Sequence, residues 1–91
     1  MPKYVIERTV PSAGDLGPED LRKLSAQSNA VRQGMTGDIQ WVQSYVAEDR
    51  LFCVYNAENA DLIREHAARG GFPCDNVRRV SAIIDPVTGE E

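Results

Sequence analysis

The segment WVQSYVAEDRLFCVYNAENADLIREH, residues 41–66, decides the fold, because it holds two strands, a tight turn and a helix in succession. Residues 41–46 alternate in the way of a strand, so Trp41, Gln43 and Tyr45 are expected on one face. After a charged turn at 48–50, residues 51–55 are rich in β-branched and aromatic types, which favours a hairpin. The apolar positions then change to helical spacing. Four residues fall on one helical stripe: Leu62, Ile63, His66 and Ala67.

Similar patterns flank this segment on both sides. Residues 4–10 alternate over a strand length and end in turn residues at 11–15. A first helix is predicted from Pro18 to about Gln33, on a stripe that is unusually polar at Ser25 and Ser28. Asn59 can cap the second helix, which ends at the two glycines 70 and 71. A fourth strand is predicted over residues 77–85, before Pro86.

The order βαββαβ predicts an α+β fold of the ferredoxin-like type, formed by one domain over residues 1–91 with a frayed tail at about 87–91. Right-handed crossovers place the first and third strands centrally in a four-stranded antiparallel sheet, with both helices on one face. Large side chains on the uncovered face, from among Trp41, Tyr45 and Tyr55, would form an exposed patch. A homodimer that buries this face is therefore expected.

Charge and composition exclude several classes of protein. The formal net charge is -4 and no basic cluster exceeds the pair Arg78 and Arg79, which argues against nucleic-acid binding. No apolar run approaches the roughly 20 residues that cross a bilayer. Charged residues at 7–8 interrupt any apolar core of an export signal, so we expect no membrane association and a cytoplasmic location. In that reducing compartment the two Cys residues should be free thiols.

Four side chains are candidate metal ligands: His66, Cys53, Cys74 and Glu7. His66 is either a ligand or proton shuttle, or a buried imidazole that is hydrogen-bonded to a neighbour. Cys53 is either a small buried apolar residue or a thiolate ligand beside His66. Cys74 lies in a loop that can fold back over the helix end, and no CxxC or HxxxH spacing joins these residues. Glu7 and Arg8 lie in a central strand, where a charge must face a partner, a ligand or a cavity, and an ion pair between subunits is the plain explanation.

Several segments together resemble a family of small bacterial nickel-binding domains that is catalogued as a domain of unknown function. The matching segments are YVIERT, SNAV, WVQSYVAEDRLFCVYNA, IREHA, GFP and the closing V-x-x-I-I-D-P. The resemblance implies a ferredoxin-like dimer of the dimeric α/β-barrel type. It also implies nickel ligands at His66, Cys53 and Glu7. Cys74 departs from the small apolar residue expected at its position, and is an extra soft ligand or a loop thiol.

The leading hypothesis is a dimeric cytoplasmic protein that sequesters or buffers nickel or a similar divalent transition metal. Nitrogen and sulfur donors also suit zinc and copper, so the ligand types do not select the metal. The alternative is a small-molecule-binding domain or enzyme that uses a cavity near His66, with Tyr45 or Tyr55 orienting the ligand. No phosphate loop, nucleophile elbow or paired-carboxylate motif is present, which favours a protein without catalytic activity.

Overall fold

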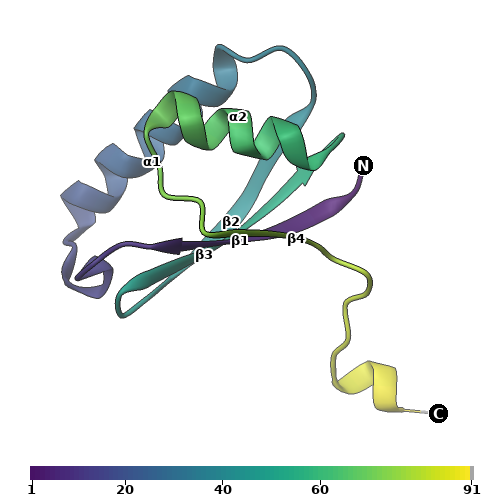
Figure 1. Ribbon diagram of the computed structural model, residues 1–91. Helices are drawn as coiled ribbons and strands as arrows, with labels where there is room; N and C mark the ends of the chain where they lie inside the picture. The colour runs from purple at the N-terminus through teal and green to yellow at the C-terminus, as the bar shows by residue number, and fades with distance from the viewer. Residues whose placement is uncertain (91) are drawn as a thin grey trace.

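The computed structural model describes residues 1–90 and has the predicted order of elements. Figure 1 shows two helices packed over one face of a single sheet. The strands are β1 (Lys3–Thr9), β2 (Ile39–Ala47), β3 (Arg50–Ala57) and β4 (Asn76–Arg79). The helices are α1 (Pro18–Gln33) and α2 (Ala60–Gly70), with the short 3-10 helices η1 (Ala13–Asp15) and η2 (Pro86–Gly89).

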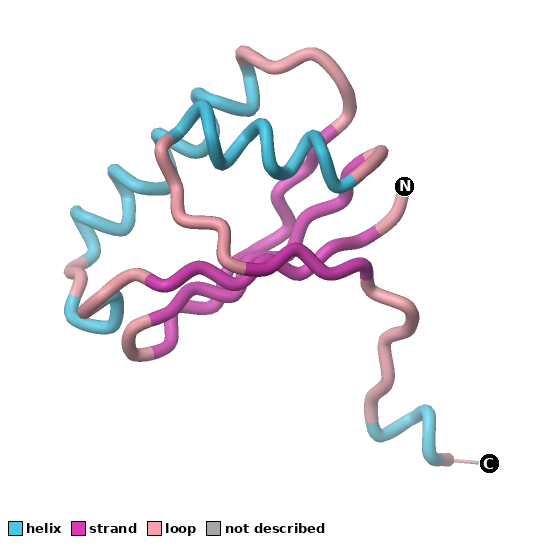
Figure 2. The backbone as a smooth tube through the Cα atoms, in the orientation of Figure 1, coloured by secondary structure: helices cyan, strands magenta, loops and turns pink. Residues whose placement is uncertain are grey.

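The sheet is antiparallel and has the order β2-β3-β1-β4. This order confirms the prediction that the first and third strands are central. The tube in Figure 2 shows both helices on the same side of the sheet, as the ferredoxin-like arrangement requires. The prediction of an α+β fold is therefore confirmed in class, in strand order and in the placement of the helices.

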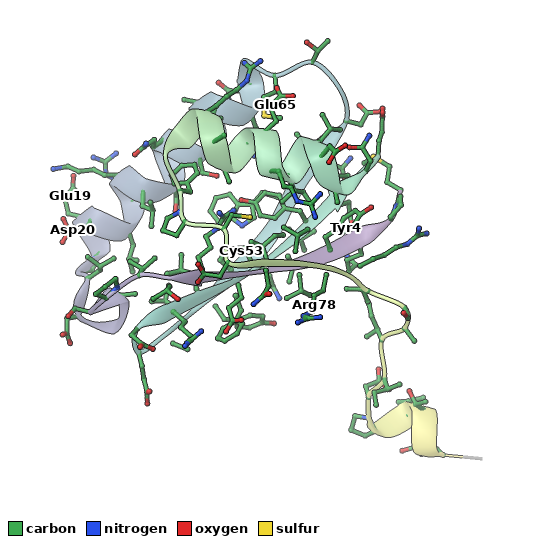
Figure 3. All side chains as sticks on the ribbon, viewed as in Figure 1. Tyr4, Glu19, Asp20, Cys53, Glu65 and Arg78 are labelled. Atoms are coloured by element: carbon green, nitrogen blue, oxygen red, sulfur yellow. The ribbon has the colours of Figure 1, made fainter. Side chains whose placement is uncertain are left out.

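The core lies between the sheet and the helices. Alternate residues of β3 are buried on this side, from Leu51 to Ala57, and the corresponding positions of β1 are Tyr4, Ile6 and Arg8. Ile63 of α2 closes over them and is fully buried. Figure 3 shows Tyr4 and Cys53 on the side of the sheet that faces the helices, and Arg78 on the opposite side. The period-2 pattern of the two central strands thus separates the core from the other face of the sheet.

We call the other side of the sheet the open face. Val5, Phe52 and Val54 are half-buried there, next to the exposed Tyr45 of β2. Tyr55, in contrast, lies in the core, so it does not contribute to the exposed patch that the sequence suggested. The open face therefore carries an apolar centre, although of the three candidate aromatic residues only Tyr45 belongs to it.

A β-bulge in β2 changes which side chains share a face. The register with β3 shifts between Trp41 and Gln43, so Val42 is an extra residue in the strand. Trp41 lies opposite Tyr55 on the helix side, where its Nε1 donates to Ser44 Oγ at 2.9 Å. The prediction that Trp41 shares a face with Gln43 and Tyr45 is therefore wrong.

The fourth strand is shorter than the 77–85 predicted from the sequence. β4 pairs with β1 only as far as Arg79, and the last bond beyond it joins Val80 N to Lys3 O at 2.8 Å. Because β1 itself begins at Lys3, residues 81–85 have no strand to pair with. The alternating pattern therefore continues beyond the sheet.

Residues 81–90 form an arm that leaves the body of the molecule (Figure 1). Asp85 and Thr88 make a capping box at η2, within the region where a frayed tail was expected, and Glu91 lies outside the described residues. Ile83, Ile84 and Val87 are each at least 68% exposed on this arm. Within residues 1–90, no helix has both the length and the apolar character needed to cross a membrane.

Candidate functional site

The single His of the chain is held in the core by α2. Asn59 precedes the helix and its side chain accepts a hydrogen bond from Leu62 N at 3.0 Å, as an N-cap does. Gly71 ends the helix with a φ of 69°, a left-handed conformation that glycine adopts at little cost. Between these ends, helical spacing directs His66 towards the sheet, where it is 1% exposed.

The hydrogen bonds of His66 define its tautomer. Its Nε2 lies 3.2 Å from the carbonyl oxygen of Ser28 on α1 and 3.3 Å from the Ser28 hydroxyl. A carbonyl oxygen only accepts, so Nε2 carries the hydrogen and donates it. In the neutral ring, Nδ1 then has a free lone pair, and no partner for it exists among the described residues. Nε2 of His66 is thus held by Ser28, and the lone pair of Nδ1 is free to bind a ligand.

The protonation state of His66 follows from its surroundings. Burial is the main cause that lowers its pKa below the ordinary 6.5, and the charges of Arg8 and Arg32 act in the same direction. The bond to the Ser28 carbonyl opposes this shift without cancelling it. His66 is therefore neutral at physiological pH, which is the form that binds a metal.

Aromatic rings surround the imidazole. The ring centroids of Tyr55 and Phe72 lie 5.6 Å and 5.3 Å from that of His66. Burial also raises the pKa of Tyr55, so its phenol stays protonated. The Phe72 ring also packs on Arg8, whose guanidinium carbon is 5.7 Å from the ring centroid. Phe72 therefore links the candidate ligand to a buried cation.

The two sulfur candidates lie on the same side of the sheet as His66. Cys53 is in the centre of β3 and is 3% exposed. Cys74 is half-buried in the loop between α2 and β4, where it lines a cavity of about 510 Å³ together with Ala67 and Phe72. Both thiols are free, which confirms the prediction made from the sequence.

Glu7 lies on the open face, on the opposite side of the sheet from His66. Its Oε1 accepts from Arg50 at 2.7 Å and its Oε2 accepts from Asn76 Nδ2 at 2.9 Å. The ion pair expected between subunits therefore has a partner within the chain itself. The neighbouring Arg8 points to the helix side, as strand alternation requires.

The structure does not gather all four candidate ligands. His66, Cys53 and Cys74 share the helix side, while Glu7 is separated from them by the sheet. Over residues 1–90, no group of three or more His, Cys, Asp or Glu side chains is close enough to hold a metal ion. A single chain in this conformation therefore supplies a donor nitrogen and nearby thiols without forming a complete coordination shell.

Two residues that contact His66 could be predicted from the sequence only in part or not at all. Ser28 is one of two serines, with Ser25, on the inward stripe of the first helix, and such a polar position on a buried stripe is the signal of a buried hydrogen bond. Phe72 follows two glycines in a loop, and its contact with His66 depends on how the chain turns there. No sequence pattern predicts that contact.

Comparison with known proteins gives a family and a fold. A family model described as "Nickel responsive protein SCO4226-like" matches residues 4–80. The crystal structure of SCO4226 from Streptomyces coelicolor A3(2) aligns with a TM-score of 0.74 and 13% sequence identity, covering 90% of this chain and 99% of that one. At this identity the alignment supports the fold alone. Comparison with curated proteins gave no match.

Proposed function

Because the chain belongs to the nickel responsive protein SCO4226-like family, we propose that it binds nickel or a similar divalent transition metal and buffers it as a homodimer. Family membership gives the chain a nickel-related role. Direct coordination of the ion, its sequestration in the cytoplasm and the dimer are the parts that we add.

The observation that supports metal binding is the state of His66. A metal-binding histidine usually donates its second N–H to a carbonyl or carboxylate, which fixes the ring and leaves the other nitrogen free. His66 has this arrangement, with Nε2 donating to the Ser28 carbonyl and Nδ1 unpartnered within the described residues. An unpartnered buried nitrogen is also costly to keep, so occupation by a ligand would remove that cost.

The remaining donors in our proposal are sulfur. Cys53 and Cys74 are the thiols on the side of the sheet that holds His66, and thiolates suit nickel, zinc and copper. Since residues 1–90 of one chain form no three-donor group, the other positions of the shell fall to water or to a second copy. Glu7 can take part only in a site on the open face, where a second copy would lie.

Thermal unfolding of untagged protein with and without Ni²⁺ tests this proposal. Bound metal stabilises the folded state by mass action, so the wild-type Tm should rise with nickel concentration. His66→Gln keeps a side-chain amide for Ser28 but removes the imidazole, and should lose most of that rise. A nickel-induced rise that is equal in the variant would reject His66 as a ligand, and no rise in wild type would reject nickel binding.

Matched thiol variants identify the sulfur donor. Cys53→Ala and Cys74→Ala each remove one thiol, and the variant with the weaker nickel affinity in calorimetry marks the ligand. Glu7→Gln is the control on the opposite side of the sheet, and its nickel affinity should equal that of the wild type if the site is within one chain. The same titrations with Zn²⁺ and Cu²⁺ determine the metal preference, because ligand type alone does not.

A further inference from the structure

A cavity of about 530 Å³ lies between α1 and the sheet, and of the four candidate metal ligands only Cys53 belongs to its lining. Its volume is within the range of roughly 300–1,000 Å³ that holds small molecules in proteins. The cavity forms because α1 does not seal onto the sheet, and Leu21 and Leu24 on its inner side remain partly exposed. The opposite wall contains Trp41, Val46 and Leu51 of the sheet.

Among residues 1–90, Arg8 is the only charged residue that lines this cavity. It is 4% exposed, and its Nη1 donates to the carbonyl oxygen of Pro73 at 2.5 Å. Its Nη2 is buried and has no hydrogen-bond partner, and no carboxylate forms an ion pair with Arg8 among residues 1–90. Arginine stays protonated in proteins, so a full positive charge lines an apolar cavity without a counterion.

Such a charge is expensive to bury. Removing a cation from water costs several kcal/mol unless an anion and hydrogen bonds compensate, as general estimates for buried ions show. The Phe72 ring and one carbonyl oxygen give partial compensation, through the ring face and one hydrogen bond. What the guanidinium of Arg8 still lacks is a negatively charged hydrogen-bond acceptor, and the adjacent cavity has room for a ligand that carries one.

We infer that this cavity binds a small aromatic monocarboxylate, whose carboxylate accepts from Nη2 of Arg8 and whose ring lies among the apolar side chains. A carboxylate matches a single free guanidinium nitrogen, with the Ser28 and Tyr55 hydroxyls in the same lining as further donors. A carboxylate carries one negative charge, which Arg8 can balance, whereas phosphate at neutral pH carries more charge than this single cation neutralises. Trp41 and Phe72 favour a flat ring in the apolar part.

The experiment uses Trp41, the single tryptophan of the chain, as a reporter inside the cavity. Metal-free protein is titrated with phenylacetate, with phenylacetamide and with inorganic phosphate, while Trp41 fluorescence and binding heat are recorded. Phenylacetate should bind at least tenfold more tightly than the amide of the same shape, and phosphate should not bind. Equal affinity for acid and amide, or no binding of the acid, would overturn the inference.

Two variants locate the ligand. Arg8→Met keeps the length of the side chain without the charge, and should reduce the affinity for phenylacetate to that for the amide. Leu24→Phe reduces the cavity from α1 without adding a second tryptophan, and should weaken the binding of both compounds while Arg8 is kept. Phenylacetate affinity that is unchanged in both variants would place the binding elsewhere and reject the site. Because the protein is metal-free, this result does not depend on nickel binding.

Discussion

The contact between Ser28 and His66 joins the two helices inside the core. Ser28 is the one buried residue of α1, and its carbonyl and hydroxyl oxygens both lie within 3.3 Å of His66 Nε2. A buried polar contact of this kind is favourable only while both groups keep their partners. Helix packing and the state of the imidazole are therefore coupled, and each can be measured through the other.

His66 should make the metal-free protein less stable in mild acid. Its pKa is lowered by burial in the folded state, so between that value and 6.5 the unfolded chain binds more protons than the folded one. The free energy of unfolding should then fall as the pH drops below 6.5, by at most about 1.4 kcal/mol per pH unit for one proton. Urea unfolding over a pH series measures this slope.

His66→Gln is the control for that slope, and its free energy of unfolding should depend less on pH in the same range.

A second group changes stability at lower pH. The pKa of Asp75 is lowered by hydrogen bonds from the hydroxyl and backbone N–H of Thr9. Its stabilisation is complete above the ordinary 3.8 and is lost as the pH falls through the lower folded value. The two effects therefore occur in different pH ranges, and an unchanged slope in His66→Gln would assign the first to another group.

Gly70 determines where the Phe72 ring lies. A Cβ at this position would collide with the ring, which packs between His66 and Arg8. Gly70→Ala should therefore displace Phe72 and lower the free energy of unfolding by about 1–3 kcal/mol, as overpacking does. Gly89→Ala is the matched control, because nothing lies within 4 Å of its added Cβ. Equal effects of the two substitutions in urea unfolding would contradict this role of Gly70.

The two helices begin in different ways, and this difference is open to test. α1 starts at Gly17 and Pro18 without a side-chain cap, whereas α2 has the Asn59 side chain on Leu62 N. Asn59→Ala should cost about 1 kcal/mol of stability, the usual effect of losing an N-cap. Asn59→Asp keeps the acceptor oxygen and should be close to wild type in chemical denaturation. A loss of similar size in both variants would show that the amide serves another purpose.

Local patterns predicted the elements well and their ends less well. The period-2 alternation of β1 and β3 and the helical stripe of α2 follow from burial on one side, so these elements could be found from the residues alone. The end of β4 could not be predicted, because it is set by the strand with which β4 pairs. β1 begins at Lys3, so the residues after Arg79 soon have no strand residue opposite them. The length of a strand depends on both paired strands, so the alternating pattern of β4 alone does not predict where it ends.

The candidate site was predictable to a similar extent. Helical spacing placed His66 in the core, and an unexpected charge in a central strand drew attention to Glu7 and Arg8. Which of these two charges faces the helices depends on the register with β3, and the structure assigns this place to Arg8. The side chains in contact with the imidazole come from three separate parts of the chain, namely α1, β3 and the loop after α2. Their meeting is a result of the tertiary fold.

The assembled sheet leaves an apolar surface that favours a second copy of the chain. Val5, Phe52 and Val54 lie side by side on the open face, and a chain of 91 residues buries only a modest part of its own surface. We therefore expect sedimentation at micromolar concentration to show twice the 10.1 kDa mass of one chain. Val54→Lys places a charge at the centre of this face and should give single chains.

Ile84→Lys is the matched control for that experiment, because it places the same charge on the exposed arm. It should leave the dimer intact if the open face forms the interface. Dissociation by Ile84→Lys alone would assign the interface to the arm instead. Sedimentation of wild type at 10.1 kDa only would rule out both interfaces at this concentration.

The bulge at Val42 limits how the length of this protein can vary among its relatives. Deleting Val42 would remove the bulge and restore strict alternation, while Trp41 keeps Tyr55 and Gln43 keeps Val54 as its partner. Deleting one of the residues 43–47 instead would move at least one side chain to the other face, since a shift of one residue exchanges the faces of a strand. Insertions and deletions should therefore accumulate at the turns, such as 35–38 and 48–49, and at the bulge itself, whereas the rest of β2 conserves its residue count.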